Sequence, residues 1–494
     1  MNSARRWLLP SYGTILALAA LSVALFPGGP GMFARDGDGA RHTRVGHVIL
    51  ETGGVPKADI FSHTKPGEPI VLHEWLSEVA LATADTLAGL PGIAVLASLL
   101  FTIGVLGIYR TADELGAPRP LALAAGVLGL FLEAVHLLPR PHLFTTAFAA
   151  VFLIVLVRFA RSGRAWALAP LPLLMPVWAN THGGFLLGVT LLVAFLIGAL
   201  LESPEFSTGR RAARPLAIVL VLCLVGTLLT PAGTRLWTYT TGHLGGDDFL
   251  LAVTQEFQSV DFHQGYARLF LIALLAGPAL WMTGRVRVTW LGAGLYLFFA
   301  SSALYAARNV ALFGLIVLPW TAMWATQALE GGGEAAKRVL ARLREMDRGD
   351  RTLRPWAWSV AWIGLIAVAL GPASDRYHFD RHRFPVEAVS HFDEIDTSGP
   401  VFNQLRWGGY LLYERPDVPV FIDGQTDFYG EALAREYIAA LQGQPEWREV
   451  LDRYGVQWTL TGPRQPLVQL LELDPGWYRE YADSTAVIYR RRAD

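Results

Sequence analysis

The chain has 494 residues, of which 52% are hydrophobic and 17% are charged, and its formal net charge at pH 7 is -1. Charged residues make up roughly 25% of a soluble protein, so this composition excludes an ordinary soluble enzyme and predicts an integral membrane protein. The near-zero net charge argues against a nucleic-acid partner, which needs a basic surface for the phosphates. The single cysteine, Cys223, leaves no disulfide framework or cysteine metal site to expect.

Apolar runs long enough to cross about 30 Å of hydrocarbon recur along the chain. We expect about 11 transmembrane helices, at 8–26, 91–110, 120–137, 143–159, 165–178, 184–201, 214–230, 267–283, 289–304, 309–327 and 356–371. The first two runs are separated by a hydrophilic loop, residues 27–75. Residues 74–88 are expected to form an amphipathic helix at the membrane interface, with Trp75 as an aromatic anchor. The sequence therefore predicts a polytopic helical membrane domain over residues 1–372.

Lys and Arg near the helix ends predict the orientation of the chain. With the N-terminus inside, the inner segments hold 19 basic residues and the outer segments before the tail hold 8, although the outer segments are longer. We therefore expect a multi-pass protein of the bacterial inner (plasma) membrane, with a cytoplasmic N-terminus. Eleven crossings then place the C-terminus outside the cytoplasm.

After the last apolar run, the pattern changes to short β-rich and helical segments typical of a small α/β domain at residues 375–494, outside the cytoplasm. The expected strands are 400–403, 418–422, 456–461 and 484–489, and the expected helices are 431–441 and 446–454. Asp423 and Trp407 belong to polar stretches that each follow an expected strand, a favoured position for binding residues. A turn and helix cap at Asp423-Gly424 is the alternative.

The first loop carries Asp36-Gly37-Asp38, a pair of carboxylates flanked by glycines. Such a pair suits a divalent cation, Mg or Mn, or general-base chemistry, while a solvated turn is the alternative. His42 follows at a spacing that brings it beside Asp38, where a carboxylate can set its tautomer and charge.

More His, Asn, Arg and carboxylate side chains are expected on the same side of the membrane. The topology explains why the inner side of the membrane holds mostly arginines. It does not explain the clustering of His and carboxylate side chains on the outer side, which suggests a polar cavity that opens outward. The guanidinium of Arg140 is well shaped to bind phosphate, and the alternative is an arginine that only reaches the membrane interface. His182 is a candidate binding residue, and the alternative is a structural role. The candidates are Arg44, Asp59, His63, His73 and Glu74 of the first loop, Arg140 and His142, Asn180 and His182, Asp247, Asp248 and Glu256, and Arg308.

In their order along the chain, these segments resemble the GT-C superfamily of membrane glycosyltransferases, which includes protein mannosyltransferases, aminoarabinose transferases and oligosaccharyltransferase catalytic subunits. The resemblance is greatest to a group of bacterial multi-span members. It departs from the Asp-Glu pair of the mannosyltransferases and from the Trp-Trp-Asp-Tyr-Gly motif of the oligosaccharyltransferases. The segments that carry it are Asp36-Gly37-Asp38, Gly54-Val55-Pro56, Asp59 to Thr64, His73-Glu74-Trp75-Leu76, Arg140-Pro141-His142, Trp178 to Gly183, Trp407 to Tyr410 and Val420 to Gly424.

The resemblance implies inverting transfer of a sugar from a polyprenyl-phosphate donor to a lipid, glycan or protein acceptor outside the cytoplasm. It implies Asp38, or else Asp36, as the general base or metal ligand. Arg140, His142 and Arg308 are candidates for holding the departing phosphate. The alternatives are a transporter or flippase for a lipid-linked or anionic solute, which would carry ionisable residues near mid-bilayer, and a non-catalytic membrane assembly factor.

Overall fold

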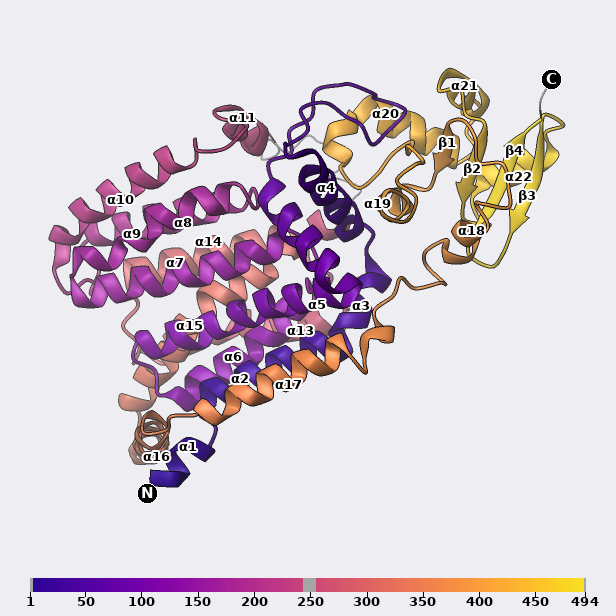
Figure 1. Ribbon diagram of the computed structural model, residues 1–494. Helices are drawn as coiled ribbons and strands as arrows, with labels where there is room; N and C mark the ends of the chain where they lie inside the picture. The colour runs from indigo at the N-terminus through magenta and orange to yellow at the C-terminus, as the bar shows by residue number, and fades with distance from the viewer. Residues whose placement is uncertain (1–2, 243–254, 493–494) are drawn as a thin grey trace.

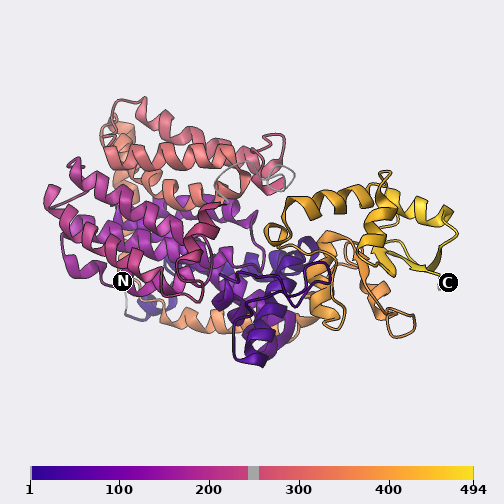
Figure 2. The ribbon, with the colours of Figure 1, turned by 90° about the horizontal axis from the view of Figure 1, so that it is seen from above.

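The computed structural model describes residues 3–242 and 255–492, and it is 67% helical with one small sheet (Figure 1). The expected loop residues Asp247 and Asp248 lie outside the described residues. The sheet lies at the end of the molecule away from the N-terminus, and the first loop lies between the helical bundle and the sheet when seen from above (Figure 2).

The bundle is built from the described helices between residues 3 and 370. Their bounds are α1 Ser3–Leu8, α2 Tyr12–Val23, α3 Gly29–Arg35, α4 Asp38–Thr52, α5 Trp75–Glu114, α6 Arg119–Ala134, α7 His142–Ser162, α8 Pro170–Ala179, α9 Phe185–Leu200, α10 Ala213–Gly226, α11 Arg235–Gly242, α13 Gly265–Trp281, α14 Trp290–Tyr305, α15 Val310–Glu330, α16 Glu334–Arg351 and α17 Ser359–Leu370. A π-helical turn, Ala24–Gly28, joins α2 to α3, and single 3-10 turns occupy Gln255–Phe257 and Ala307–Asn309.

Four of the described helices are long and apolar enough to cross a membrane: Arg6–Arg35, Trp75–Glu114, His142–Ser162 and Ala307–Glu330. A fifth span results if Glu334–Arg351 and Trp356–Leu370, which meet at a bend of 75°, are taken as one. Four expected spans coincide with shorter apolar helices, at Ala165–Ala179, Phe185–Leu200, Gly265–Trp281 and Trp290–Tyr305. The chain is a helical membrane protein, and the number of about 11 crossings stays a prediction.

The first loop is more ordered than a solvated loop, because it contains α3 and the 15-residue helix α4. Helix α4 ends at Gly53, which has a positive φ of 69° and donates its backbone N–H to the carbonyl of Ile49. Helix α5 begins at Trp75 and breaks at Ala88 and Gly89, so its first part corresponds to the amphipathic helix expected at 74–88. The carboxylate pair therefore lies at a helix start rather than in a free turn.

A glycine sets the distance between α4 and α5. A Cβ atom at Gly46 would lie 2.0 Å from the carbonyl oxygen of Glu78, so only glycine permits this close approach. The approach brings the α4 side chains of Arg41 and His42 against Glu78 of α5. The local sequence thus decides which polar groups share the space between the two helices.

The C-terminal part contains a four-stranded sheet in the order β1-β2-β4-β3. Strands β1 and β2 are parallel, and the other two pairs are antiparallel. The strands are β1 Val401–Asn403, β2 Trp458–Thr461, β3 Trp477–Ala482 and β4 Val487–Arg491, and the helices around them are α18 Val386–Ser390, α19 Leu405–Glu414, α20 Thr426–Leu441, α21 Trp447–Arg453 and α22 Pro466–Leu473. One hydrophobic core continues from the bundle into this part, and a second core packs on the other face of the sheet.

The strand expected at 418–422 is wrong, since these residues do not join the sheet. Val420 instead exchanges backbone hydrogen bonds with the first loop, donating to Phe61 at 3.0 Å and accepting from His63 at 3.0 Å. The backbone N–H and C=O groups of a short extended segment need hydrogen-bond partners, and here the backbone of the first loop supplies them. Strand β3 and helices α18, α19 and α22 were not expected from the sequence.

Candidate active site

Asp36, Asp38 and Arg140 form the centre of the polar cluster. Asp36 follows α3, Asp38 begins α4, and Arg140 lies in the turn between α6 and α7. The Arg140 guanidinium donates through Nε and Nη2 to the two oxygens of Asp36, and its Nη2 lies 2.9 Å from Oδ2 of Asp38. The Asp36 side chain is 8% exposed and the Asp38 side chain is 27% exposed. Both oxygens of Asp36 thus accept bonds from Arg140, whereas the Asp38 side chain is more exposed to solvent.

The two carboxyl groups have opposite pKa shifts. Burial alone would raise the pKa of Asp36, but its two bonds from Arg140 outweigh burial and hold this pKa below its ordinary value. Burial raises the pKa of Asp38 to about 6, with Asp36 and Asp423 adding to the shift and with Arg140 and His42 opposing it. A carboxylate with a pKa near the working pH suits proton transfer, so Asp38 rather than Asp36 has the properties of a general base.

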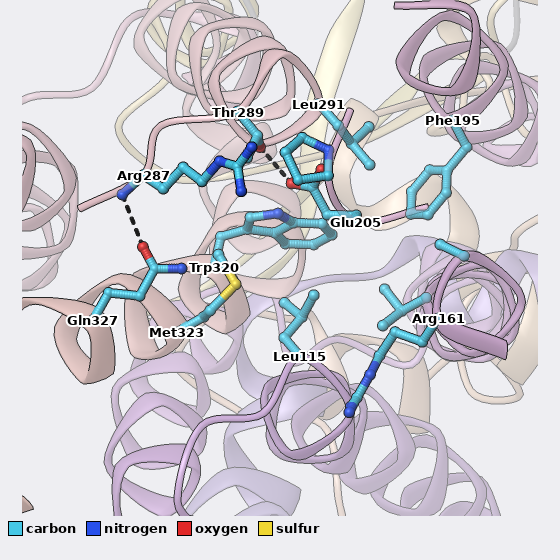
Figure 3. Close-up of a pocket in the computed structure, with 13 residues that line it drawn as sticks. Leu115, Arg161, Phe195, Glu205, Arg287, Thr289, Leu291, Trp320, Met323 and Gln327 are labelled. Atoms are coloured by element: carbon cyan, nitrogen blue, oxygen red, sulfur yellow. Dashed lines mark hydrogen bonds between the residues drawn. The ribbon is translucent and has the colours of Figure 1, made fainter. Parts of the chain in front are cut away.

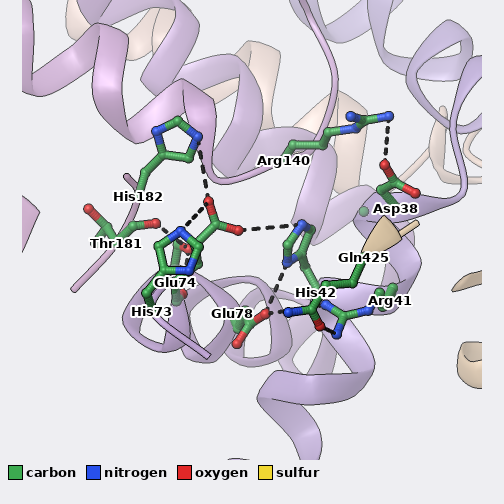
Figure 4. A network of polar contacts seen from close by, with 12 residues as sticks. Asp38, Arg41, His42, His73, Glu74, Glu78, Arg140, Thr181, His182 and Gln425 are labelled. Carbon is green, nitrogen blue, oxygen red and sulfur yellow. Dashed lines mark hydrogen bonds and ion pairs between the residues drawn. The ribbon is translucent and has the colours of Figure 1, made fainter. Parts of the chain in front are cut away.

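A second cluster surrounds Glu74, at the start of α5 (Figure 4). The Nε2 atoms of His42, His73 and His182 lie 3.8, 3.7 and 3.5 Å from its carboxylate oxygens. His42 also bonds through Nδ1 to Oε1 of Glu78 at 3.0 Å. Burial opposes protonation of His42, but the bond to Glu78 and the charge of Glu74 raise its pKa. These histidines and carboxylates form a network of polar contacts beside the Asp38–Arg140 pair (Figure 4).

His182 differs from His42 in its protonation. Its Nδ1 accepts the backbone N–H of Gly184 at 2.9 Å, which leaves Nε2 as the position for the ring proton, facing Glu74. Burial, together with the positive groups around it, lowers the pKa of His182 well below its ordinary value. His182 is therefore a neutral ring whose Nε2 faces the Glu74 carboxylate at 3.5 Å.

The C-terminal part closes the site from the other side. Asp423 accepts a 3.1 Å bond from Nε of the buried Arg41 on α4, and it also accepts from the backbone of Gln425 and the hydroxyl of Tyr429. Beside it, a Cβ atom on Gly424 would lie 1.9 Å from Oδ1 of Asp38. Asp423 thus anchors the tail on α4, and Gly424 gives the Asp38 carboxylate room. The sequence did not single out Arg41 as a site residue, and Gly424 was named only in the Val420 to Gly424 segment and in a turn with Asp423.

Glu256 connects Arg140 with the other arginine expected to bind phosphate. Its carboxylate oxygens lie 4.0 Å from Nη1 of Arg140 and 3.9 Å from Nη1 of Arg308. The Arg308 guanidinium stacks on the ring of Phe257 at 4.5 Å, and the backbone N–H of Ala307 donates to Gln258. Two arginines therefore face one anionic group at the edge of the cluster, which is the arrangement that a phosphate needs.

Several expected binding residues have structural partners instead. Asn180 accepts from Trp75, His142 donates to the carbonyl of His136, and Asp59 caps the backbone N–H groups of Phe61 and Ser62. In the same way His63 donates to the carbonyl of Val401, Arg44 pairs with Glu51 at the surface, and the indole of the buried Trp407 donates to the carbonyl of Arg383. These groups position the loop and the tail around the site.

The glycines after Trp407 have a similar role. A Cβ atom at Gly409 would lie 2.4 Å from the carbonyl oxygen of Gly37, and one at Gly408 would lie 2.3 Å from that of Ile422. This stretch lets α19 touch the start of α4. The Trp407 to Tyr410 segment therefore supports the Asp38 backbone.

Asp36 and Asp38 were also expected to hold a divalent cation. Both carboxylates face the Arg140 guanidinium, which takes the place that a cation shared by them would need. Among the described residues, no three His, Cys, Asp or Glu side chains are spaced to hold a metal ion. With Arg140 in this position the two carboxylates do not fit a shared cation, and the expected Mg or Mn site stays a prediction.

The chain matches no protein-family model and no curated protein sequence, but it is similar to solved structures of membrane enzymes. Archaeal oligosaccharyltransferase AglB from Archaeoglobus fulgidus, in complex with an inhibitory peptide and a dolichol-phosphate, aligns with a TM-score of 0.59 at 11% identity, over 97% of this chain and 74% of that one. ArnT from Cupriavidus metallidurans, bound to undecaprenyl phosphate, aligns with a TM-score of 0.51 at 15% identity, over 97% of each chain.

A third similar structure is arabinofuranosyltransferase AftD from Mycobacteria, with a TM-score of 0.53 at 14% identity. The alignment covers 98% of this chain and 40% of AftD, so the chain spans less than half of that enzyme. All three are GT-C glycosyltransferases. The backbone agrees over nearly the whole chain despite the low identity, and we conclude that this protein has a GT-C-like fold.

Proposed function

We propose that the protein is a membrane glycosyltransferase that moves a sugar from a polyprenyl-phosphate-linked donor to an acceptor outside the cytoplasm, with inversion at the anomeric carbon. The observation that carries this proposal is the partly exposed Asp38 carboxylate, with its raised pKa, beside Arg140 on a GT-C-like fold. The structures of AglB with dolichol-phosphate and ArnT with undecaprenyl phosphate support the class of donor. The acceptor is a lipid, a glycan or a protein.

In the proposed reaction, Asp38 takes the proton of an acceptor hydroxyl as that oxygen attacks the anomeric carbon. The new C–O bond forms while the bond from the anomeric carbon to the phosphate oxygen breaks, and the phosphate leaves with the electron pair. Arg140 and Arg308 stabilise its growing negative charge, because their guanidinium groups already face one anion, Glu256. Asp36 acts as a positioning residue that fixes the Arg140 guanidinium.

We also propose an inner-membrane location with the N-terminus in the cytoplasm. The basic helix α16 lies near the N-terminal helix α1, and the backbone N–H of Arg354 donates to the carbonyl of Arg6 at 2.8 Å (Figure 1). The tail and the Asp38 site are joined at the other end, through Arg41 and Asp423. This separation supports an inner face rich in Arg and an outer face that carries the site.

Sugar transfer from native lipid-linked donors, measured in membranes, tests the proposal. Asp38→Asn is expected to reduce the transfer rate by about a hundredfold to ten-thousandfold, the usual contribution of a general base. Arg44→Gln is the matched control, since Arg44 lies in the same loop and pairs with Glu51 at the surface. Wild-type transfer by Asp38→Asn, at equal protein level, would contradict the proposal.

A specific observation keeps transport as a second candidate. Glu133 is buried in α6, and neither of its carboxyl oxygens has a hydrogen-bond partner among the described residues. A carboxyl group at such a position is typical of proton-coupled carriers. If transport is the function, Glu133→Gln abolishes substrate movement across vesicles while Asp38→Asn leaves it unchanged. A glycosyltransferase gives the opposite ranking in the transfer assay.

A further inference from the structure

A cavity of about 290 Å³, drawn in close-up in Figure 3, is lined by residues at the ends of helices that begin beside the candidate active site. Helices α5, α7 and α15 all begin beside the site, at Trp75, His142 and Val310, and the cavity is formed where the same helices end. Its wall is completed by the loop after α9 and the start of α14. The cavity is therefore separate from the proposed reaction centre.

The cavity has a charged rim and an apolar floor. Arg161 and Arg287 are exposed and lie on opposite sides of the Trp320 indole (Figure 3), while Phe195, Leu291 and Trp320 are buried. A ligand that fits both surfaces must carry an anionic group beside an apolar part.

The charges of the rim favour an anion. Its carboxylate, Glu205, is already hydrogen-bonded by the hydroxyls of Ser203 and Thr289. In the described part of the chain, neither Arg161 nor Arg287 has a carboxylate within 4.0 Å of its guanidinium. Two arginines without a counter-ion at the mouth of a cavity are a natural site for a phosphate group.

The floor carries an unused donor. Trp320 is 1% exposed, and its indole Nε1–H has no partner among the described residues. An unpaired buried donor costs about 1–3 kcal/mol, so an oxygen of a bound ligand would stabilise this position. Trp281 and Trp324 also have unpaired indole N–H groups, but they do not line the cavity.

The neighbours of the cavity place its mouth at the membrane surface. Trp166 is 72% exposed and Trp290 is 71% exposed, and both lie close in sequence to the arginines of the rim. Exposed tryptophans beside arginines mark the headgroup level of a bilayer, where lipids of that leaflet can enter a pocket between helices.

From these observations we propose that the cavity binds one anionic glycerophospholipid from the leaflet at this face, with its phosphate at Arg161 and Arg287. A glycerol or ester oxygen accepts the Trp320 N–H, and the start of an acyl chain covers Phe195 and Leu291. This inference depends on the membrane position of the cavity and not on the reaction proposed for the Asp38 site.

Native mass spectrometry of the full chain, with phosphatidylglycerol, phosphatidylcholine or soluble glycerol 3-phosphate as the probe, tests the proposal. The wild type is expected to retain one phosphatidylglycerol in preference to phosphatidylcholine. Arg161→Gln with Arg287→Gln should weaken this retention by about tenfold or more, the value of one charge-assisted contact. Trp320→Phe, which keeps an aromatic ring and removes the N–H, should weaken it by about threefold.

Arg164→Gln with Arg285→Gln is the matched control, because these neighbours carry the same charge but do not line the cavity. The proposal is overturned if the control loses as much lipid as the Arg161 and Arg287 variant, or if that variant retains lipid like the wild type. Equal binding of glycerol 3-phosphate and phosphatidylglycerol would overturn the proposal that the ligand is a lipid, and it would indicate a soluble phosphate ester as the ligand. If the double variant fails to fold, the Trp320→Phe variant and the three probes still test the proposal. The proposal is contradicted if Trp320→Phe retains phosphatidylglycerol like the wild type and if the wild type binds phosphatidylglycerol and phosphatidylcholine equally.

Discussion

Replacing Asp38 by asparagine should stabilise the protein while it removes the activity. The pKa of Asp38 in the folded protein is about 6, compared with an ordinary value of 3.8. Because the folded-state pKa is the higher one, folding disfavours the ionised carboxylate: the destabilisation is present above about pH 6 and disappears as the pH falls below about 4. The shift corresponds to roughly 3 kcal/mol, and the 27% exposure of the side chain reduces this to about 1–3 kcal/mol.

Thermal unfolding of the detergent-solubilised protein, measured between about pH 4 and pH 8, gives the first readout. At about pH 7.5 we expect Asp38→Asn to unfold about 1–3 °C above the wild type, and at about pH 4 we expect the two to coincide. The second readout is the pH dependence of transfer by the wild type, whose rate should fall on the acid side with a midpoint near pH 6, as the base becomes protonated.

Two results would refute this reasoning. If Asp38→Asn unfolds at a lower temperature than the wild type at neutral pH, the carboxylate stabilises the fold through Arg140 and its ionised form is not strained. If transfer stays constant from about pH 8 down to about pH 5, the group that titrates in catalysis is not Asp38 with a raised pKa.

Three further changes test other parts of the site. Asp36→Asn should destabilise the protein at neutral pH by about 2–4 kcal/mol, because it removes the carboxylate that bonds Arg140 through both of its oxygens. The pKa of Asp36 is lowered in the folded protein, so this stabilisation is present above about pH 4 and is lost as the pH falls through the lowered pKa, where the unfolding temperatures of the two proteins should converge. Gly424→Ala should reduce transfer by about tenfold or more with an unchanged unfolding temperature, since the added Cβ displaces the carboxylate of Asp38, the proposed general base. Gly54 has open space around its Cα, so Gly54→Ala should match the wild type in both measurements. Glu256→Gln should lower the donor KM by about twofold to fivefold by removing the anion that competes with the phosphate, and an increased KM would show that Glu256 contacts substrate instead.

Part of the fold and part of the site could be predicted from the sequence, because both are local patterns. Hydropathy identified the positions of the helices, since each span satisfies its own backbone groups and its lipid-facing side chains must be apolar. The same reasoning drew attention to Asp36, Asp38, His42 and Arg140, because ionisable groups are costly near a bilayer and gather where they have a role. The structure brings these residues together.

The tertiary structure alone decided which groups share a contact. Arg41 meets Asp423 across 382 positions, and Val420 pairs with Phe61 of the first loop rather than with the sheet. No local pattern of hydropathy or turn residues encodes such partners, because they depend on how helices and loops pack once the glycines at 46 and 409 allow close approach. The sequence by itself therefore predicted a multi-span protein with a carboxylate pair and an arginine near one another, and long-range packing decided that Arg140 bonds both oxygens of Asp36 whereas the Asp38 side chain is more exposed and has the raised pKa.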